Sequence, residues 1–411
     1  MRRAVHLRSI VGRLLREGAA FGRKSVLGTL VTCVLLTLGA PPLTAAGPRV
    51  QLRSATIYPE VPLSNSVMSS RYDLIIFQDN AVTPGGWDPG ADTDIGDPQR
   101  IPKLKAANPN LKVLLYVFPQ ISWGWEDGFH EDWAVHAADG SRVKNPGDPN
   151  DMTLMNINNA EYRRFIISRI VDTVNRYGFD GAFNDGIWPT VNLGQEWVGW
   201  TPTPPQEALD NWHAWSLQLL RELKQALGSK LLITNTTYLY DDKNPKNHDD
   251  DFLSVVDGTM LEGYLHAPWD PPTTDNRDWW AFQQSMVKRN SDKGKYFIGL
   301  SGMGDPWTAD QMRKWQLFTF GSYLLRADGR WDYYQWSSWG YFPELDAPLG
   351  TPLGDAYSSG GVWQRDFTNG KVIVNTSGST KTVGLPEPYR SLQGSDTVQL
   401  APSTAVILLG Q

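Results

Sequence analysis

The segment Phe179-Asp180-Gly181-Ala182-Phe183-Asn184-Asp185-Gly186 shows how this chain is built, because its pattern recurs at Val256-Asp257-Gly258-Thr259-Met260-Leu261-Glu262-Gly263. Each copy begins with an apolar residue followed by Asp-Gly, continues as a short apolar run, and ends in an acid followed by glycine. Apolar runs of this length, bounded by turn residues, are typical of buried β-strands. Both copies are therefore interpreted as strands of the same kind.

Outward from these copies, short β-rich segments alternate with longer segments of helical period, as expected for βα units around a parallel sheet. The pattern predicts eight strands, at 55–58, 73–78, 112–118, 179–185, 231–236, 258–264, 296–301 and 331–336. It predicts long helices at 159–177, 205–227, 278–289 and 309–325. The first two of these helices stop at Gly178 and Gly228, and glycine is the residue best suited to a helix C-terminus.

Eight strands with intervening helices match the (β/α)₈ TIM barrel, whose usual size is ~250 residues. An open doubly wound sheet is the alternative, but no G-x-G-x-x-G or P-loop sequence follows the first predicted strand. After Pro343 the helical period ends, and short β segments are predicted at 370–375, 380–385, 397–400 and 405–409. The fold class is thus α/β, with a catalytic barrel at 48–343 and a small all-β, sandwich-like C-terminal domain at 344–411. The absence of a long linker predicts that the two domains pack together.

The N-terminus has the layout of a secretory signal peptide. Basic residues up to Lys24 precede the apolar run Val26 to Ala40, and small residues follow at Thr44-Ala45-Ala46. Residues 1–46 are therefore predicted to be a signal peptide, and the protein is predicted to be secreted to the cell envelope or medium. An uncleaved membrane anchor is the alternative, although the apolar run is shorter than the ~20 residues of a spanning helix. The only cysteine, Cys33, lies in this segment, which excludes intramolecular disulfides and cysteine-based sites.

The charge balance narrows the classes of partner. The chain has 38 Lys and Arg against 44 Asp and Glu. Seven of the bases and only one of the acids fall in the first 47 residues, so residues 48–411 carry a net charge of −12. A surface of that sign repels phosphate backbones and anionic lipid. Nucleic acid is therefore not an expected partner, and neither is a membrane once the signal peptide has been removed.

Asp185 and Glu262 close the two matched segments and follow the fourth and sixth predicted strands. The C-terminal ends of barrel strands are where barrel enzymes place their chemistry. Two carboxylates facing each other there are the minimum equipment for glycoside hydrolysis, in which one donates a proton and the other acts as nucleophile or base. Taken singly, each acid could instead form an ion pair with a neighbouring base. Asp180 and Asp257 enter from the opposite rim, where a role in turns or helix contacts is expected.

Aromatic and amide side chains near the same rim suit a sugar. Many of the 18 tryptophans fall just beyond predicted strand ends, where core packing does not explain them. Flat aromatic faces stack on the C–H faces of pyranose rings, with single-stranded bases as the alternative ligand. The predicted substrate-binding residues are Asp79, Tyr116, Trp123, Trp125, Asn184, Trp188, Asn235, Tyr264, His266, Trp269 and Trp336.

No metal or cofactor is expected from the sequence. The run His248-Asp249-Asp250-Asp251 and the aspartates between 88 and 97 lack the twelve-residue spacing of an EF-hand, so solvated acidic loops are favoured. The motifs G-x-S-x-G and H-E-x-x-H are also absent from the chain, which disfavours serine hydrolases and zincins.

Several segments, taken in order, resemble glycosyl-hydrolase-like family 15. They are 72–77, 107–116 and 177–181 with Asn184-Asp185 in the barrel, and 348–350, 369–375 and 400–402 in the C-terminal domain. The resemblance implies a (β/α)₈ catalytic barrel with a β-sandwich-like tail that acts on an oligo- or polysaccharide. Related barrels carry a catalytic Asp after strand four, which implies Asp185, and a second acid after strand five or six, which implies Glu262.

The sequence thus predicts an exported glycoside hydrolase that needs no cofactor. Asp185 would be the nucleophile of a retaining enzyme or the base of an inverting one, and Glu262 the proton donor with a raised pKa. Retention is slightly favoured. A non-catalytic carbohydrate-binding or cell-surface protein and a transglycosylase remain alternatives. The sequence indicates neither the sugar nor the oligomeric state.

Overall fold

The computed structural model describes residues 52–57, 63–79, 87–88, 93–94, 96–123, 128–148, 151–187, 190–191, 199–236, 248–275, 277–337, 340–385, 389–390 and 396–410. The predicted signal peptide lies outside these ranges. Within them, no helix combines the length and the apolar character that crossing a membrane requires.

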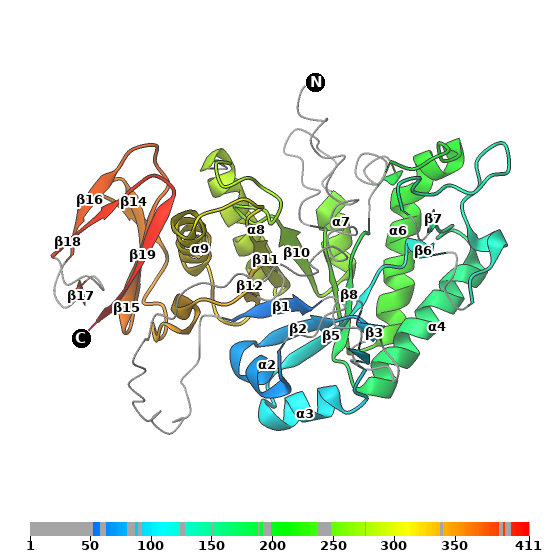
Figure 1. Cartoon of the computed structure of the whole chain (residues 1–411), viewed down its shortest axis with the longest axis horizontal. Helices are drawn as coiled ribbons and strands as arrows, with labels where there is room; N and C mark the ends of the chain where they lie inside the picture. The colour runs from blue at the N-terminus through cyan, green and yellow to red at the C-terminus, as the bar shows by residue number, and fades with distance from the viewer. Residues whose placement is uncertain are drawn as a thin grey trace, which may run out of the picture.

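Eight parallel strands form one nearly closed barrel (Figure 1). Each strand pairs with the next in the order β1, β2, β5, β8, β9, β10, β11, β12. A parallel bridge between Arg53 and Tyr334 brings the first and last strands together. The strands are β1 (Ser54–Ile57), β2 (Leu74–Phe77), β5 (Lys112–Val117), β8 (Gly181–Asn184), β9 (Leu231–Thr234), β10 (Gly258–Glu262), β11 (Tyr296–Ser301) and β12 (Asp332–Trp336). The predicted (β/α)₈ barrel is confirmed.

A helix lies between each strand of the barrel and the next. These helices are α2 (Asn65–Arg71), α3 (Arg100–Ala107), α4 (Ala160–Tyr177), α6 (Gln206–Leu227), α7 (His248–Val255), α8 (Trp280–Asp292) and α9 (Ala309–Leu324). The ends of α4 follow from its sequence: the Asn159 side chain accepts hydrogen bonds from the first-turn amides, and Gly178 ends the helix in the left-handed conformation. The interpretation of His248–Asp251 as a solvated loop is wrong, because these residues form the first turn of α7 and Asp249 is buried against Arg289.

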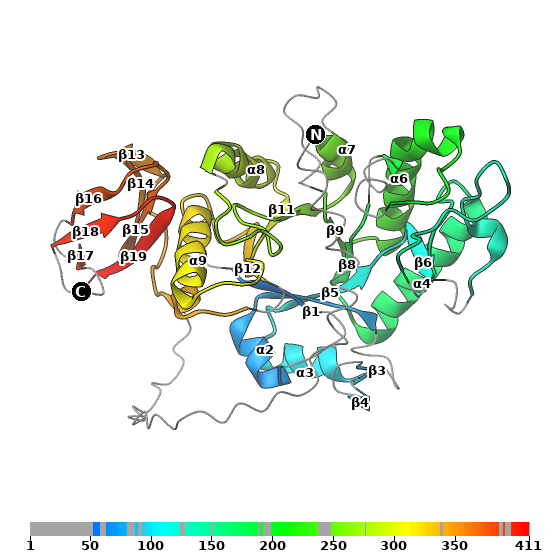
Figure 2. The ribbon, with the colours of Figure 1, turned by 45° about the horizontal axis from the view of Figure 1, so that its top comes forward.

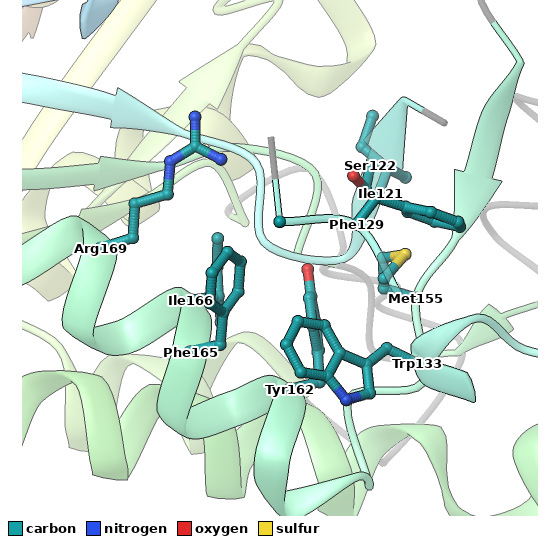
Figure 3. Close-up of a pocket in the computed structure, with 10 residues that line it drawn as sticks. Ile121, Ser122, Phe129, Trp133, Met155, Tyr162, Phe165, Ile166 and Arg169 are labelled. Atoms are coloured by element: carbon teal, nitrogen blue, oxygen red, sulfur yellow. The ribbon is translucent and has the colours of Figure 1, made fainter. Parts of the chain in front are cut away.

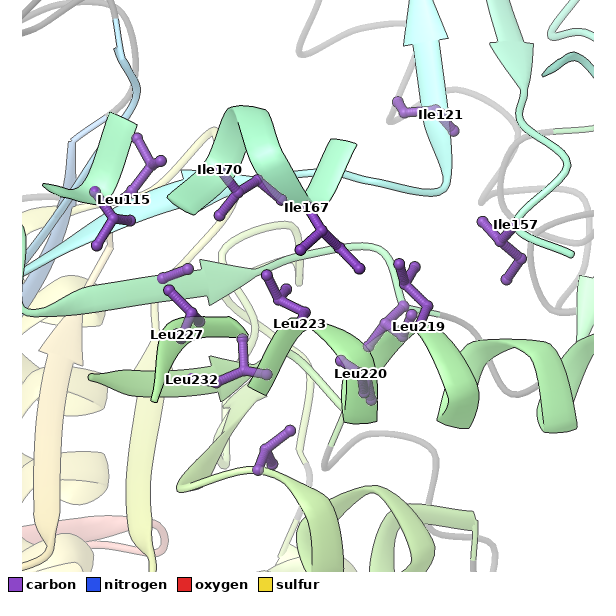
Figure 4. Close-up of a cluster of buried hydrophobic side chains, with 14 of the residues drawn as sticks. Leu115, Ile121, Ile157, Ile167, Ile170, Leu219, Leu220, Leu223, Leu227 and Leu232 are labelled. Atoms are coloured by element: carbon purple, nitrogen blue, oxygen red, sulfur yellow. The ribbon is translucent and has the colours of Figure 1, made fainter. Parts of the chain in front are cut away.

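Alternation along each strand divides the core into two layers. One side chain or more from most strands fills the barrel interior, among them Leu114, Phe183 and Met260. The opposite face of the strands packs against the helices. Figure 4 shows Leu115 and Leu232 of β5 and β9 facing Ile167 of α4 and Leu223 of α6. The interior is therefore a packed core, and ligands must bind at its mouth.

The connection after β5 is the longest described insertion. It contains the short antiparallel pair β6 (Ile121–Trp123) and β7 (Met152–Leu154), with the 3₁₀ helix η3 (Glu131–Trp133) between them. A bridge between Lys144 and Thr201 joins the insertion to the segment before α6. A second short pair, β3 (Trp87–Asp88) and β4 (Thr93–Asp94), follows β2.

The two Asp-Gly dipeptides of the matched segments join neighbouring strands at the rim formed by the N-terminal ends of the strands. The carboxylate of Asp180 accepts the amide of Val113 at 2.7 Å, and that of Asp257 accepts the amide of Leu232 at 2.8 Å. Each of these aspartates also forms an ion pair with a lysine: Asp180 with Lys105, and Asp257 with Lys224. Asp180 and Asp257 thus have the structural role that the sequence analysis expected.

The glycines that follow these aspartates are needed for close approach between strands. A Cβ on Gly181 would overlap the backbone of Leu231, and one on Gly258 would overlap Tyr296 on the next strand. The Asp fixes the register with the strand before, and the Gly allows contact with the strand after.

A C-terminal antiparallel domain packs on α9 (Figure 2). One sheet has the order β13 (Tyr357–Ser359), β14 (Val362–Phe367), β15 (Gly370–Asn375), β19 (Thr404–Gly410) and β17 (Tyr389–Arg390), and a second pairs β16 (Lys381–Gly384) with β18 (Thr397–Leu400). Val372, Val374 and Ala405 share one hydrophobic cluster with α9. The buried guanidinium of Arg365 donates to the carbonyls of Leu324 and Ala327 at the end of α9. The expected contact between the domains is confirmed.

Replacing Asp180 or Asp257 by alanine should destabilise the barrel. Each change leaves a strand amide without its acceptor and removes the carboxylate partner of a lysine, which costs about 1–3 kcal/mol of unfolding free energy. Urea unfolding followed by far-UV circular dichroism measures the loss. The exposed Asp132→Ala variant serves as control, and equal stability of all three variants would contradict the proposed register contact.

Candidate active site

Asp185 and Glu262 lie at the mouth of the barrel. Phe183 and Met260, two residues before them, fill the barrel interior. Because side chains alternate along a strand, Asp185 and Glu262 face the same interior, at the end of their strands. Each is followed by a glycine with positive φ, 61° at Gly186 and 94° at Gly263, where the chain turns away from the strand.

The carboxylate of Asp185 is held by three donors. The Tyr116 hydroxyl donates to Oδ2 at 2.6 Å, and the amide of Gly186 donates to Oδ1 at 2.7 Å. The side-chain amide of Asn235 also donates to Oδ1, at 3.0 Å. Donors of this kind favour the ionised form of a carboxyl group and fix its orientation. The three donors therefore fix the orientation of the Asp185 carboxyl group.

Asn235 connects the two acids. Its Nδ2 also donates to Oε2 of Glu262, at 2.7 Å, so a single amide nitrogen contacts both carboxyl groups. In the described part of the chain neither acid lies within ion-pair distance of a Lys or Arg. The alternative in which each acid is neutralised by a neighbouring base thus has no support among these residues.

Glu262 is disposed to hold a proton. Its removal from water, and secondly the negative charge of Asp185, raise the pKa of Glu262 from 4.5 to about 7, against the opposing effect of the Asn235 hydrogen bond. Asp185 thus receives three hydrogen-bond donors, while burial and the neighbouring acid raise the pKa of Glu262. Such a pair of unlike carboxyl groups can supply a nucleophile or base together with a general acid.

The structure does not bring every predicted residue to this site. Asn184 directly precedes Asp185, so alternation turns it toward the helices, where it is fully buried. Trp336 packs with Phe342 in the outer cluster. The structure therefore does not bring either side chain to the two acids.

The two predicted residues beyond Glu262 are also buried. The Tyr264 hydroxyl accepts a hydrogen bond from Gln284 of α8, within the outer core. The ring of His266 lies 4.3 Å from that of Trp315, and its Nδ1 is 2.7 Å from the carbonyl of Gly302. The positive φ at Gly263 takes the chain out of strand geometry, so the alternation that placed these residues on the rim does not continue. The structure therefore places both side chains in the core beside α8 and α9.

The remaining predicted residues differ in how far they are described. Asp79 is exposed two residues beyond β2, and Trp269 is partly exposed beside Gly263. The side chain of Trp123 and all of Trp125 and Trp188 lie outside the described residues. The sequence analysis missed the Gly186 amide as a donor to Asp185, although the acid-glycine pattern was a signal for it.

A small cavity lies away from these acids, between the insertion after β5 and α4 (Figure 3). Its volume is about 20 Å³, which is room for about one water molecule. Ile121, Trp133 and Phe165 are among the side chains that line it. The cavity is too small for a sugar ring. In the described ranges, no three His, Cys, Asp or Glu side chains cluster closely enough to hold a metal ion.

The profile of hypothetical glycosyl hydrolase family 15 matches residues 105–371, which include Asp185, Asn235 and Glu262. The chain belongs to this family. Membership in hypothetical glycosyl hydrolase family 15, on a barrel of this kind, makes the protein a glycoside hydrolase, and it leaves the substrate unassigned.

Solved structures with the same fold are also carbohydrate-active. A dextranase of glycoside hydrolase family 31 from Flavobacterium johnsoniae matches with a TM-score of 0.54 and 10% identity, over 88% of this chain and 51% of its own. The α-glucosyl transfer enzyme XgtA matches with a TM-score of 0.51 and 12% identity, over 90% of this chain and 100% of its own. An α-amylase from Lactobacillus plantarum matches with a TM-score of 0.50 and 11% identity, over 88% of this chain and 99% of its own. At these identities the likeness shows the fold alone. No curated protein matches the chain significantly.

Replacing Asn235 by alanine should raise the pKa of Glu262 further. The Asn235 hydrogen bond lowers this pKa, and a hydrogen bond to a charged group corresponds to about one to two pKa units. Infrared titration of the protonated carboxyl band, identified by its loss in Glu262→Gln, measures the shift. Asn184→Ala is the matched control, since this neighbouring amide faces the helices. An unchanged pKa in Asn235→Ala would contradict the bridge.

Proposed function

We propose that this family member is a secreted glycosidase that cleaves oligo- or polysaccharides by a two-carboxylate mechanism. The observation that carries the proposal is the shared amide of Asn235, which donates both to Asp185 and to Glu262, an acid with a raised pKa, at one barrel mouth. Secretion rests on the signal-peptide layout of residues 1–46. No cofactor is needed for this chemistry.

The spacing of the acids favours retention of configuration. Because one nitrogen contacts an oxygen of each acid, at 3.0 and 2.7 Å, these oxygens can be no farther apart than the two bonds laid end to end. That limit on the nearest pair of oxygens is compatible with the ~5–5.5 Å between the carboxyl groups of retaining enzymes. On this basis we propose Asp185 as the nucleophile.

The proposed reaction has two steps and begins with Glu262 in its protonated form. Glu262 gives its proton to the leaving oxygen while a carboxylate oxygen of Asp185 attacks the anomeric carbon, breaking the glycosidic bond and forming a glycosyl ester. Oδ1 accepts two hydrogen bonds, and Oδ2 accepts one among the described residues, so Oδ2 keeps more electron density available for attack. In the second half, ionised Glu262 takes a proton from water, whose oxygen displaces Asp185.

Asp185→Asn and Glu262→Gln should each lower kcat/KM by at least about a hundredfold, the scale of a lost acid, base or nucleophile. Release of reducing ends from a panel of polysaccharides measures activity. The exposed Asp132→Asn and Glu207→Gln variants are matched controls. Full activity in both site variants would mean that the wrong acids have been chosen. Sugar binding without turnover in the wild type would favour a binding protein, and products longer than the substrate would favour a transglycosylase.

Activity should fall as the pH rises above about 7. Glu262 must carry its proton to act as the acid, and its pKa of about 7 means that the protonated fraction is lost through that region. A pH profile of kcat/KM, measured on the polysaccharide that the panel identifies as substrate, tests this. A basic limb near the ordinary pKa of a glutamate would contradict the assignment.

Proton NMR of the first product should show the retained anomer.

A further inference from the structure

Two tryptophans near the barrel mouth are strongly exposed. Trp279 is 48% exposed and Trp307 43%, whereas Trp200, Trp212 and Trp315 are almost completely buried. Leaving a large aromatic ring in water forgoes the favourable burial of its surface. Trp279 ends the 3₁₀ helix η5 (Arg277–Trp279) before α8, and Trp307 directly precedes the residue that caps α9.

Both residues stand on the catalytic side of the barrel. They lie at the N-terminal ends of the helices that follow β10 and β11, and in this fold those ends lie at the same rim as the strand C-termini. Figure 1 shows α8 and α9 as neighbours beside these strands, and their contacts confirm it. Trp269 lies next to the end of the strand that carries Glu262. Its ring edge would be 3.8 Å from a Cβ placed on Gly263, the residue after Glu262.

The loops that carry these tryptophans are joined to each other. The amide of Gly302 donates to the carbonyl of His266, and the amide of Gly304 donates to that of Asp270, both at 2.9 Å. The fully buried ring of His266 adds the contact with the Gly302 carbonyl and packs on Trp315 of α9. The two loops therefore form one unit directly connected to Glu262, so their aromatic rings are held in place before a ligand arrives.

We propose that Trp269, Trp307 and Trp279 form a stacking surface for the leaving-group portion of a sugar polymer. The inference rests on the proposed function, in which Glu262 protonates the leaving oxygen. The part of the chain that leaves must then lie on the Glu262 side, over the loops after β10 and β11. Exposed flat rings can stack on the C–H faces of successive pyranose units. A short substrate would not need such a surface.

The charge of these loops narrows the polymer further. The loop after β10 contains Asp270, Asp275 and Asp278 against one base, Arg277, and residues 302–310 contain Asp305 and Asp310 with no base. Like charges across an interface disfavour binding. The expected polymer is therefore neutral or bears amines, and it lacks carboxylate or sulfate groups.

The test compares two substrates of one sugar. The first is the neutral or amino polysaccharide that the wild type hydrolyses, and the second is the corresponding nitrophenyl glycoside, whose leaving group is a single ring. For Trp279→Ala combined with Trp307→Ala, kcat/KM on the polymer should fall at least tenfold more than on the nitrophenyl glycoside. Leu353→Ala removes an exposed apolar side chain from the C-terminal domain and is the matched control.

Equal losses on both substrates, or no loss on the polymer, would overturn the stacking surface while leaving the proposed function intact. Binding is measured separately by affinity electrophoresis of Asp185→Asn in gels that contain the same polysaccharide. The tryptophan variants in this background should lose retardation, and unchanged retardation would overturn the proposal. If instead Asp185→Asn and Glu262→Gln remain fully active, the proposed function fails, and the leaving-group assignment fails with it. Preference for an acidic polysaccharide would overturn the charge argument.

Discussion

The geometry of the site depends on one kind of hydrogen bond. An aspartate carboxylate just before a strand accepts it from a backbone amide of the preceding strand in the barrel. Asp180 fixes β8 against β5, and Asp257 fixes β10 against β9. In both segments five positions separate this aspartate from the acid at the mouth. A slip of one residue in either strand would turn its acid from the barrel interior to the helices. The register contacts at one rim thus determine which side chains meet at the other.

Once the two acids face each other, their difference comes from what surrounds them. Asp185 receives donors from a hydroxyl, a backbone amide and a side-chain amide, while Glu262 receives only the shared Asn235 among the described residues. Two adjacent carboxyl groups in a poorly solvated site cannot both ionise easily. Burial, and secondly the charge of Asp185, raise the pKa of Glu262, so Glu262 is the acid of the pair that is disposed to hold a proton. Asn235 limits how far apart they can move, and this makes it a structural element of the pair.

Much of this arrangement could be predicted from the sequence, because hydrophobic period and turn residues determine strands and helices locally. All eight barrel strands and the acids at their ends were predicted within a few residues. The failures have physical causes. Asn184 and Trp336 were assigned by distance from a strand end, without regard to alternation. Tyr264 and His266 follow a glycine whose positive φ ends the alternation. Strand β14 was missed since Gln364, Arg365 and Asp366 interrupt its apolar character, and Arg365 is buried against the carbonyls of Leu324, Ala327 and Gly354.

The packing of the C-terminal sheet on α9 has a consequence for how this protein can be divided. Gly321 of α9 has no side chain at the point where it meets Ala405, so helix and sheet approach closely along an apolar seam. The same helix supports β11 and β12 and begins next to Trp307. An apolar contact therefore crosses the boundary near residue 343 that is clear in the sequence pattern. A chain shortened there would expose the apolar flank of α9 to water.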